Sequence, residues 1–70
     1  MTYTLKLYEW DISAGGSGFA GYPSAPAIAI ELKSETTSFQ ARALGKKLMQ
    51  LAKTKVKVML ENSEEITEIK

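Results

Sequence analysis

Residues 13–26, with the sequence SAGGSGFAGYPSAP, constrain the fold of this chain more than any other segment. Four of these fourteen residues are glycine and two are proline. Glycine loses much conformational entropy in regular structure and proline cannot donate to a hydrogen-bond ladder, so the segment predicts a long loop. Regular structure must therefore come from the residues before and after it.

Alternation of apolar and polar side chains predicts strands on both sides of this loop. Thr2–Ile12 is rich in aromatic and β-branched residues, and Ala27–Lys33 alternates between large apolar and small or charged residues. A third alternating run covers Lys55–Glu61. The tail EEITEIK is too short for a stable helix, so we expect it to form a short fourth strand.

One segment has the signature of a helix. Thr37 and Gln40 have the spacing of a capping box, and the helix should run from there to about Lys53. Gly45 lowers helix propensity by up to about 1 kcal/mol relative to alanine, for which close approach of the helix to the sheet would compensate. Phe39 lies off the apolar stripe, so it either folds over the helix entrance or is exposed. The stripe that should face the core comprises Ala41, Leu44, Gly45, Leu48, Leu51 and Ala52.

These elements predict a single α+β domain over residues 1–70. A helix that joins the second and third strands is a crossover connection, which makes those two strands parallel within one sheet. The first strand is apolar on both faces and fits between them, antiparallel to both. We therefore expect β-β-α-β order and strand order 2-1-3. The sheet would have three strands, or four with the tail, and one helix packed on one face.

The chain contains no cysteine and no histidine, which limits its chemistry. Those residues supply most zinc ligands and most nucleophile–base pairs, so we expect no metal, no cofactor and no catalytic residue. Residues 16–21, GSGFAG, match the G-x-G-x-x-G pattern. The chain continues into Tyr22-Pro23 and a strand rather than the helix that a dinucleotide site requires, so we interpret 16–21 as part of the loop.

The size of the chain favours self-association. A domain of this length buries only about 60% of the surface of its unfolded chain, and it has no disulfide or metal to compensate. A partner subunit is the remaining common source of stability. The apolar stretches are far shorter than the roughly 18 residues of a membrane span, and no signal-peptide core follows Met1. We expect a cytoplasmic protein without membrane contact.

The sheet face opposite the helix is the candidate interaction surface. One helix cannot cover both faces, and the other face would expose an apolar patch that monomers usually avoid. We expect a non-enzymatic accessory or inhibitory protein that acts by protein–protein contact through this face or an edge strand, as a homodimer or with another protein. The residues assigned to this surface are Lys6, Tyr8, Trp10, Phe19, Tyr22, Lys57 and Met59.

Two other interpretations of this face stay open. The rings could stack on bases while Lys6 and Lys57 contact phosphates, which describes a single-stranded nucleic-acid binder. A net charge of +1 is far from the strongly basic footprint of a dedicated binder of that kind. Alternatively, the glycine-rich loop or the tail folds back and covers Tyr8 and Trp10.

Charge is distributed unevenly along the second half of the chain. From Phe39 to Lys57 there are six basic residues and no acidic one, whereas the tail from Glu61 to Glu68 is acidic. Packing of the tail beside the helix would neutralise these basic residues. The alternative is an anion-binding edge along the helix.

Overall fold

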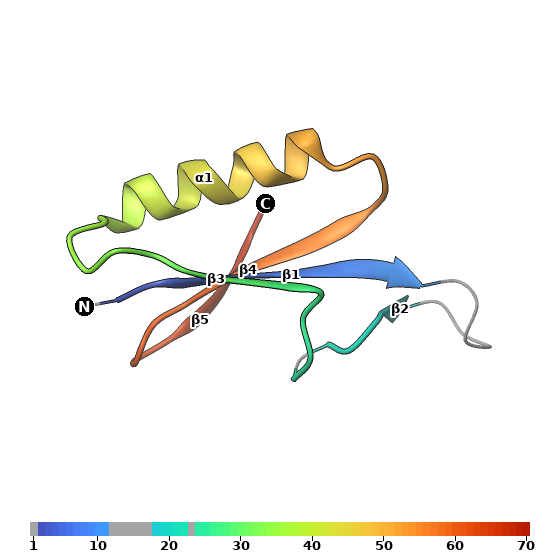
Figure 1. Ribbon diagram of the computed structural model, residues 1–70, viewed down its shortest axis with the longest axis horizontal. Coiled ribbons are helices and arrows are strands. Elements are labelled where there is room, and N and C mark those ends of the chain that lie inside the picture. Colours follow the sequence, from blue (N-terminus) through green and yellow to red (C-terminus); the bar gives the residue numbers. More distant parts are fainter. Residues whose placement is uncertain (1, 12–17, 23) are drawn as a thin grey trace.

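The computed structural model describes residues 2–11, 18–22 and 24–70, which form a curled antiparallel sheet with one helix on one face (Figure 1). The elements in chain order are β1 (Thr4–Asp11), β2 (Gly18–Phe19), β3 (Ile28–Glu31), α1 (Ser38–Leu51), β4 (Val56–Glu61) and β5 (Ile66–Ile69). The α+β class expected from the sequence is confirmed.

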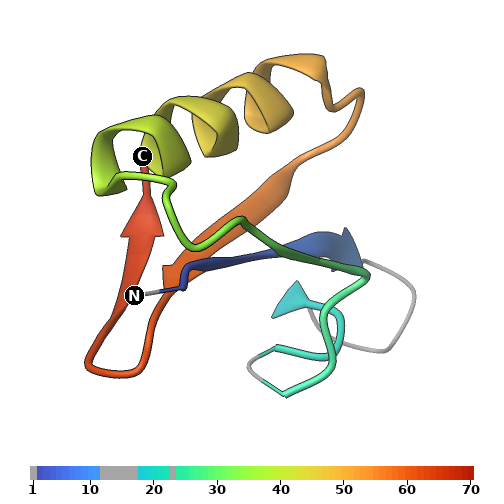
Figure 2. The ribbon, with the colours of Figure 1, turned by 60° about the vertical axis from the view of Figure 1, so that its left-hand side comes forward.

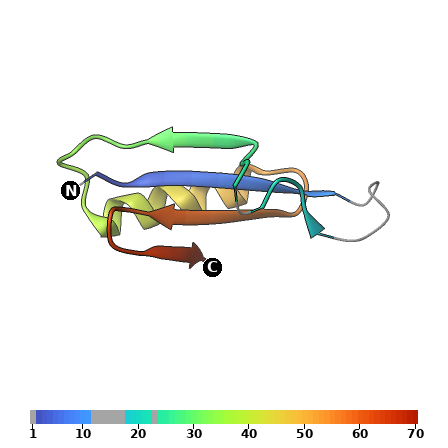
Figure 3. The same cartoon turned by 90° about the horizontal axis from the view of Figure 1, so that it is seen from below.

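Strand β1 is the centre of the sheet. It pairs with β4 along one side, and along the other side it pairs first with β3 and then, near its end, with β2. Strand β5 pairs with the outer side of β4, so β3 and β5 form the two edges (Figure 3). All four pairings are antiparallel.

The strand count expected from the sequence is too low. The tail forms β5 as expected, but two residues of the predicted loop, Gly18 and Phe19, form β2 beside Trp10 and Asp11. The order 2-1-3 therefore describes only the middle of the sheet, where β1 lies between β3 and β4. Ile12 and residues 13–17 of the predicted loop lie outside the described residues.

The capping box at the start of α1 is confirmed. The amide of Gln40 donates to Thr37 Oγ1 and the amide of Thr37 donates to Gln40 Oε1, each at 3.1 Å. These two bonds satisfy backbone donors that no helical carbonyl can reach. The helix ends at Leu51, two residues before the expected Lys53, because Ala52 adopts extended backbone angles. No helix among the described residues is long and apolar enough to cross a bilayer.

The core lies between α1 and the sheet face above β1, β4 and β5. Its buried members are Leu5, Leu7, Ala41, Val58, Leu60 and Ile69. The sheet curls so that β5 rises toward the first half of α1 (Figure 2). A Cβ atom on Gly45 would overlap Cδ1 of Ile69, which confirms the expected close approach and identifies β5 as the approaching strand.

Two of the six residues in the predicted core stripe of α1 are exposed. Leu44 is 39% exposed and Leu51 is 70% exposed, whereas Ala41 and Gly45 are buried. This is because the helix lies to one side of the sheet: α1 packs mainly on β4 and β5 and not over β3 (Figure 3). A helix is about 10 Å wide while four strands spaced about 4.8 Å apart are wider, so one side of the sheet stays uncovered.

Candidate interaction surface

The chain leaves the sheet between β2 and β3 and crosses the face opposite the helix. Carbonyls two residues apart on β1, those of Glu9 and Leu7, accept hydrogen bonds from the amides of Ala20 and Ala27, which are seven residues apart. Figure 1 shows residues 20–22 and 24–27 on the side of β1 away from α1. We call residues 18–22 the strap. It ends in a turn, in which Gly21 has a positive φ of 74°.

The strap places two rings against the sheet. Tyr22 packs edge-on against Tyr8 with ring centres 5.0 Å apart, and Phe19 packs edge-on against Trp10 with ring centres 5.1 Å apart. Tyr8 is 2% exposed as a result, while Tyr22 is 44% exposed. The structure therefore contradicts the expectation that Tyr8 is an exposed contact residue, because the strap covers it.

Met59 is also buried, at 8% exposure, which corrects its expected place on an open face. It lies opposite Lys6 on β1 and Glu68 on β5. Lys6 Nζ pairs with Glu61 at 3.0 Å and Lys57 Nζ pairs with Glu68 at 3.8 Å. Lys6 and Glu68 are the neighbours of Met59 on β1 and β5, and their partners Glu61 and Lys57 lie two positions from Met59 on β4. The face around Met59 is thus charged and internally paired, not an apolar patch.

Lysine ammonium groups lie over the rings of Trp10, Phe19 and Tyr22. Lys55 Nζ lies 4.3 Å from the ring centre of Trp10, and Lys57 Nζ lies 4.6 Å from that of Tyr22 and 5.2 Å from that of Phe19. Cation–π contacts of this kind contribute about 0.5–1 kcal/mol each at exposed sites. An ammonium group therefore occupies one face of each ring, so a nucleic-acid base would have to stack on the other face or displace a lysine.

Exposed apolar side chains gather instead on the helix side of the molecule, beside β3. Ile28 is 47% exposed and lies near Leu48 and Leu51, which line a shallow groove of about 270 Å³ with it. We call Ile28, Leu44, Leu48 and Leu51 the apolar strip. The spacing of three and four residues along the helix is visible in the sequence and predicts a core face, but it does not show which strands the helix covers.

Strand β3 is an edge with little protection against pairing. The amide of Leu32 donates to the carbonyl of Tyr3, so by the alternation of an antiparallel ladder the backbone groups of Ala29 and Glu31 point away from β1. Residues 27–30, AIAI, carry no charge. The other edge, β5, contains Glu68 and is flanked by Glu65 and Lys70. Charged side chains are a common defence of edge strands, and β3 has one only at its end.

Comparison with family models, with curated proteins and with solved structures finds no match for this chain. Within the part of the chain that the structure describes, no three acidic side chains lie together in a way that could hold a metal ion. The function is therefore argued from the geometry of the surfaces alone.

Proposed function

We propose that this protein is a non-enzymatic interaction module that forms a homodimer through the β3 edge. The observation that carries the proposal is the coincidence of an edge strand whose only charge is at its end with the exposed apolar strip beside it. Pairing would extend the sheet across a two-fold axis, with β3 of one copy antiparallel to β3 of the other. Protein–protein contact as an accessory or inhibitory protein, in the reducing cytoplasm that the lack of cysteine suits, belongs to the same proposal.

The side chains on β3 suit such pairing. Ile28 and Ile30 lie on the helix side of the sheet, and in a symmetric antiparallel pair they would meet the same residues of the second copy. The alanines at positions 27 and 29 lie on the opposite face, where small side chains permit close approach. The β3 strand of the second copy would approach Leu44 and Leu51 and bury part of their exposed surface.

The experiment compares two exposed isoleucines on opposite edges. Ile28→Lys changes β3 and Ile66→Lys makes the same change on β5, where Ile66 is 65% exposed. Light scattering at tens of micromolar should give twice 7.7 kDa for the parent chain and for Ile66→Lys, and a single chain for Ile28→Lys. A monomeric parent, or a dimer broken by Ile66→Lys but not by Ile28→Lys, contradicts the proposal.

The nucleic-acid alternative has some support in the gathering of Trp10, Phe19 and Tyr22 around Lys55 and Lys57. We favour the dimer because the lysines already contact the rings. Electrophoretic shift with a single-stranded oligonucleotide separates the two. Affinity for an oligonucleotide that falls steeply as salt rises would support the alternative, whereas dimerisation through apolar contacts should hold or strengthen.

A further inference from the structure

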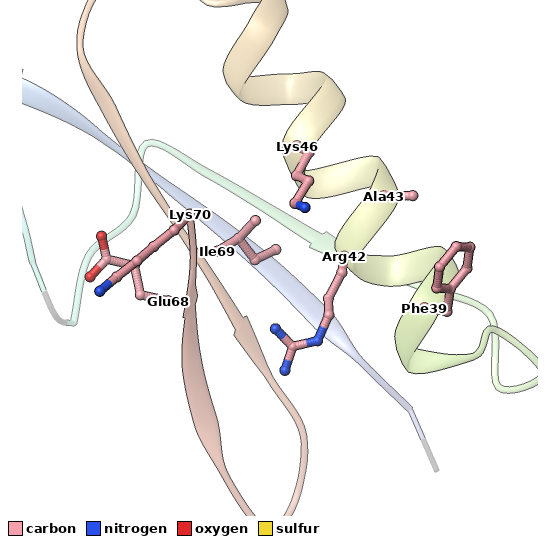
Figure 4. Close-up of a pocket in the computed structure, with 7 residues that line it drawn as sticks. All are labelled: Phe39, Arg42, Ala43, Lys46, Glu68, Ile69 and Lys70. Carbon is pink, nitrogen blue, oxygen red and sulfur yellow. The ribbon is translucent and has the colours of Figure 1, made fainter.

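A second groove lies on the other side of the helix, between α1 and β5. Its volume is about 530 Å³. Figure 4 shows Arg42 and Lys46 extending from α1 toward β5, with Ile69 between the helix and the strand. The residues that line it are Phe39, Arg42, Ala43, Lys46, Glu68, Ile69 and Lys70.

The helix wall of this groove carries positive charge that the fold does not neutralise. Within the described residues, the side chains of Arg42 and Lys46 take part in no salt bridge or hydrogen bond. The one acidic residue that lines the groove, Glu68, pairs with Lys57 on the neighbouring strand β4. The expected neutralisation of the helix by the acidic tail therefore does not occur at these two residues.

The groove has the length and spacing of an extended peptide. A smaller groove lined by Lys46, Met49, Gln50 and Lys70 continues it along α1. Together they follow the helix from position 39 to position 50, which is about 16 Å at 1.5 Å per residue and fits about five extended residues. Arg42 and Lys46 are separated by about 6 Å along the axis, close to the roughly 6.7 Å between alternate side chains of a strand.

We infer that this groove binds an extended acidic segment of a partner protein, with carboxylates at alternate positions that pair with Arg42 and Lys46. The guanidinium group of Arg42 can accept a carboxylate in bidentate geometry. Apolar residues between the carboxylates would face Ala43 and the rim residue Phe39, which is 80% exposed. This combination of apolar and cationic lining favours a peptide over a phosphate backbone. The site goes beyond the proposed dimer, and it lies on the opposite edge of the sheet from β3, so a β3-paired dimer leaves both grooves open.

The test uses a fluorescein-labelled peptide of about nine residues that alternates glutamate and valine in its centre, with a glutamine version as its control. Fluorescence anisotropy should show binding of the glutamate peptide that weakens as salt rises, and binding of the glutamine peptide at least about tenfold weaker. The double variant Arg42→Glu/Lys46→Glu should lose at least about tenfold in affinity for the glutamate peptide. Both residues are exposed, and circular dichroism checks that the variant is folded.

A matched control makes the same change of net charge elsewhere. Lys47→Glu/Lys53→Glu alters two exposed lysines that do not line the groove, and it should bind the glutamate peptide within about twofold of the parent. Equal losses in both double variants, equal binding of the two peptides, or displacement of the peptide by millimolar inorganic phosphate would overturn the inference. Ile28→Lys, which disrupts only the proposed dimer, should bind the peptide as the parent does, so failure of one proposal is distinguishable from failure of the other.

Discussion

At the scale of single residues, Gly45 shows how the sequence encodes the close approach of helix and strand. Its missing side chain leaves room for Ile69, which is 2% exposed, and a Cβ atom there would also lie 3.4 Å from Leu5 Cδ2. Glycine in a helix costs up to about 1 kcal/mol of propensity, and the packing of Ile69 into the core offsets that cost.

Gly45→Ala should therefore destabilise the protein even though alanine is the better helix former. Overpacking of a well-filled core costs about 1–3 kcal/mol, which exceeds the gain in propensity. Urea unfolding should show a net loss of about 1 kcal/mol. Ile69→Val removes the methyl group that clashes, so in the Gly45→Ala background it should cost less than it does in the parent. Additive effects of the two substitutions would show that the contact does not limit packing.

Much of the residue pattern was predictable from alternation. The pairing of Lys6 with Met59 and of Tyr8 with Lys57 places these residues on one face, as the alternation of both strands indicated. The burial of Tyr8 matches the alternative in which the glycine-rich loop folds back over it, but alternation could not decide between that alternative and an open face. The burial depends on the strap, whose course follows from the positive φ of Gly21 and from the seven-residue step between Ala20 and Ala27. The alternation of apolar and polar residues along a strand does not show whether a neighbouring loop crosses the face of the sheet.

At the scale of elements, the strap is the least expected part of the fold, since its two-residue strand lies within a glycine-rich segment. It is attached by the ladder between β2 and β1, by the bond from Ala20 to Glu9 and by ring contacts to Tyr8 and Trp10. Ring pairs of this geometry contribute about 0.5–1.5 kcal/mol beyond the burial of their area.

Phe19→Ala should loosen the strap and destabilise the protein by about 1–2 kcal/mol, because it removes the ring that covers Trp10. Trp10 is the only tryptophan, so the fluorescence reports on the surroundings of this one ring. The emission maximum should move to longer wavelength at temperatures where the chain is still folded. Phe39→Ala, which removes a phenylalanine that is 80% exposed, is the control and should leave both the spectrum and the stability nearly unchanged. An unchanged spectrum in Phe19→Ala would argue against the contact.

The helix was predicted well and its position on the sheet was not. The capping box fixed the start at Thr37, and the apolar stripe identified the buried residues Ala41 and Gly45. A stripe defines which way a helix faces but not which strands it covers, so it predicts burial of Leu44 and Leu51, which the structure leaves exposed at the open β3 side. The curl of β5 toward α1, which decides this position, depends on long-range packing of Ile69.

At the scale of the whole molecule, one helix on a curled sheet creates two different flanks. The β3 flank exposes the apolar strip and has a charge only at the end of its strand, while the β5 flank has charged residues and the cationic groove. The face opposite the helix, which the sequence indicated as the contact surface, is closed by the strap and by two ion pairs. The proposed dimer would thus present two peptide grooves at its outer ends.

Amide hydrogen exchange at several protein concentrations tests the β3 pairing most directly. The amides of Ala29 and Glu31 point away from β1, so in the monomer they face solvent and in the proposed dimer they bond to the second copy. Their protection should rise at least about tenfold as the concentration passes through the dimer range, whereas that of Ile66 and Glu68 on the β5 edge should stay constant. Protection at Ala29 and Glu31 that is independent of concentration, or a rise confined to Ile66 and Glu68, would contradict the account.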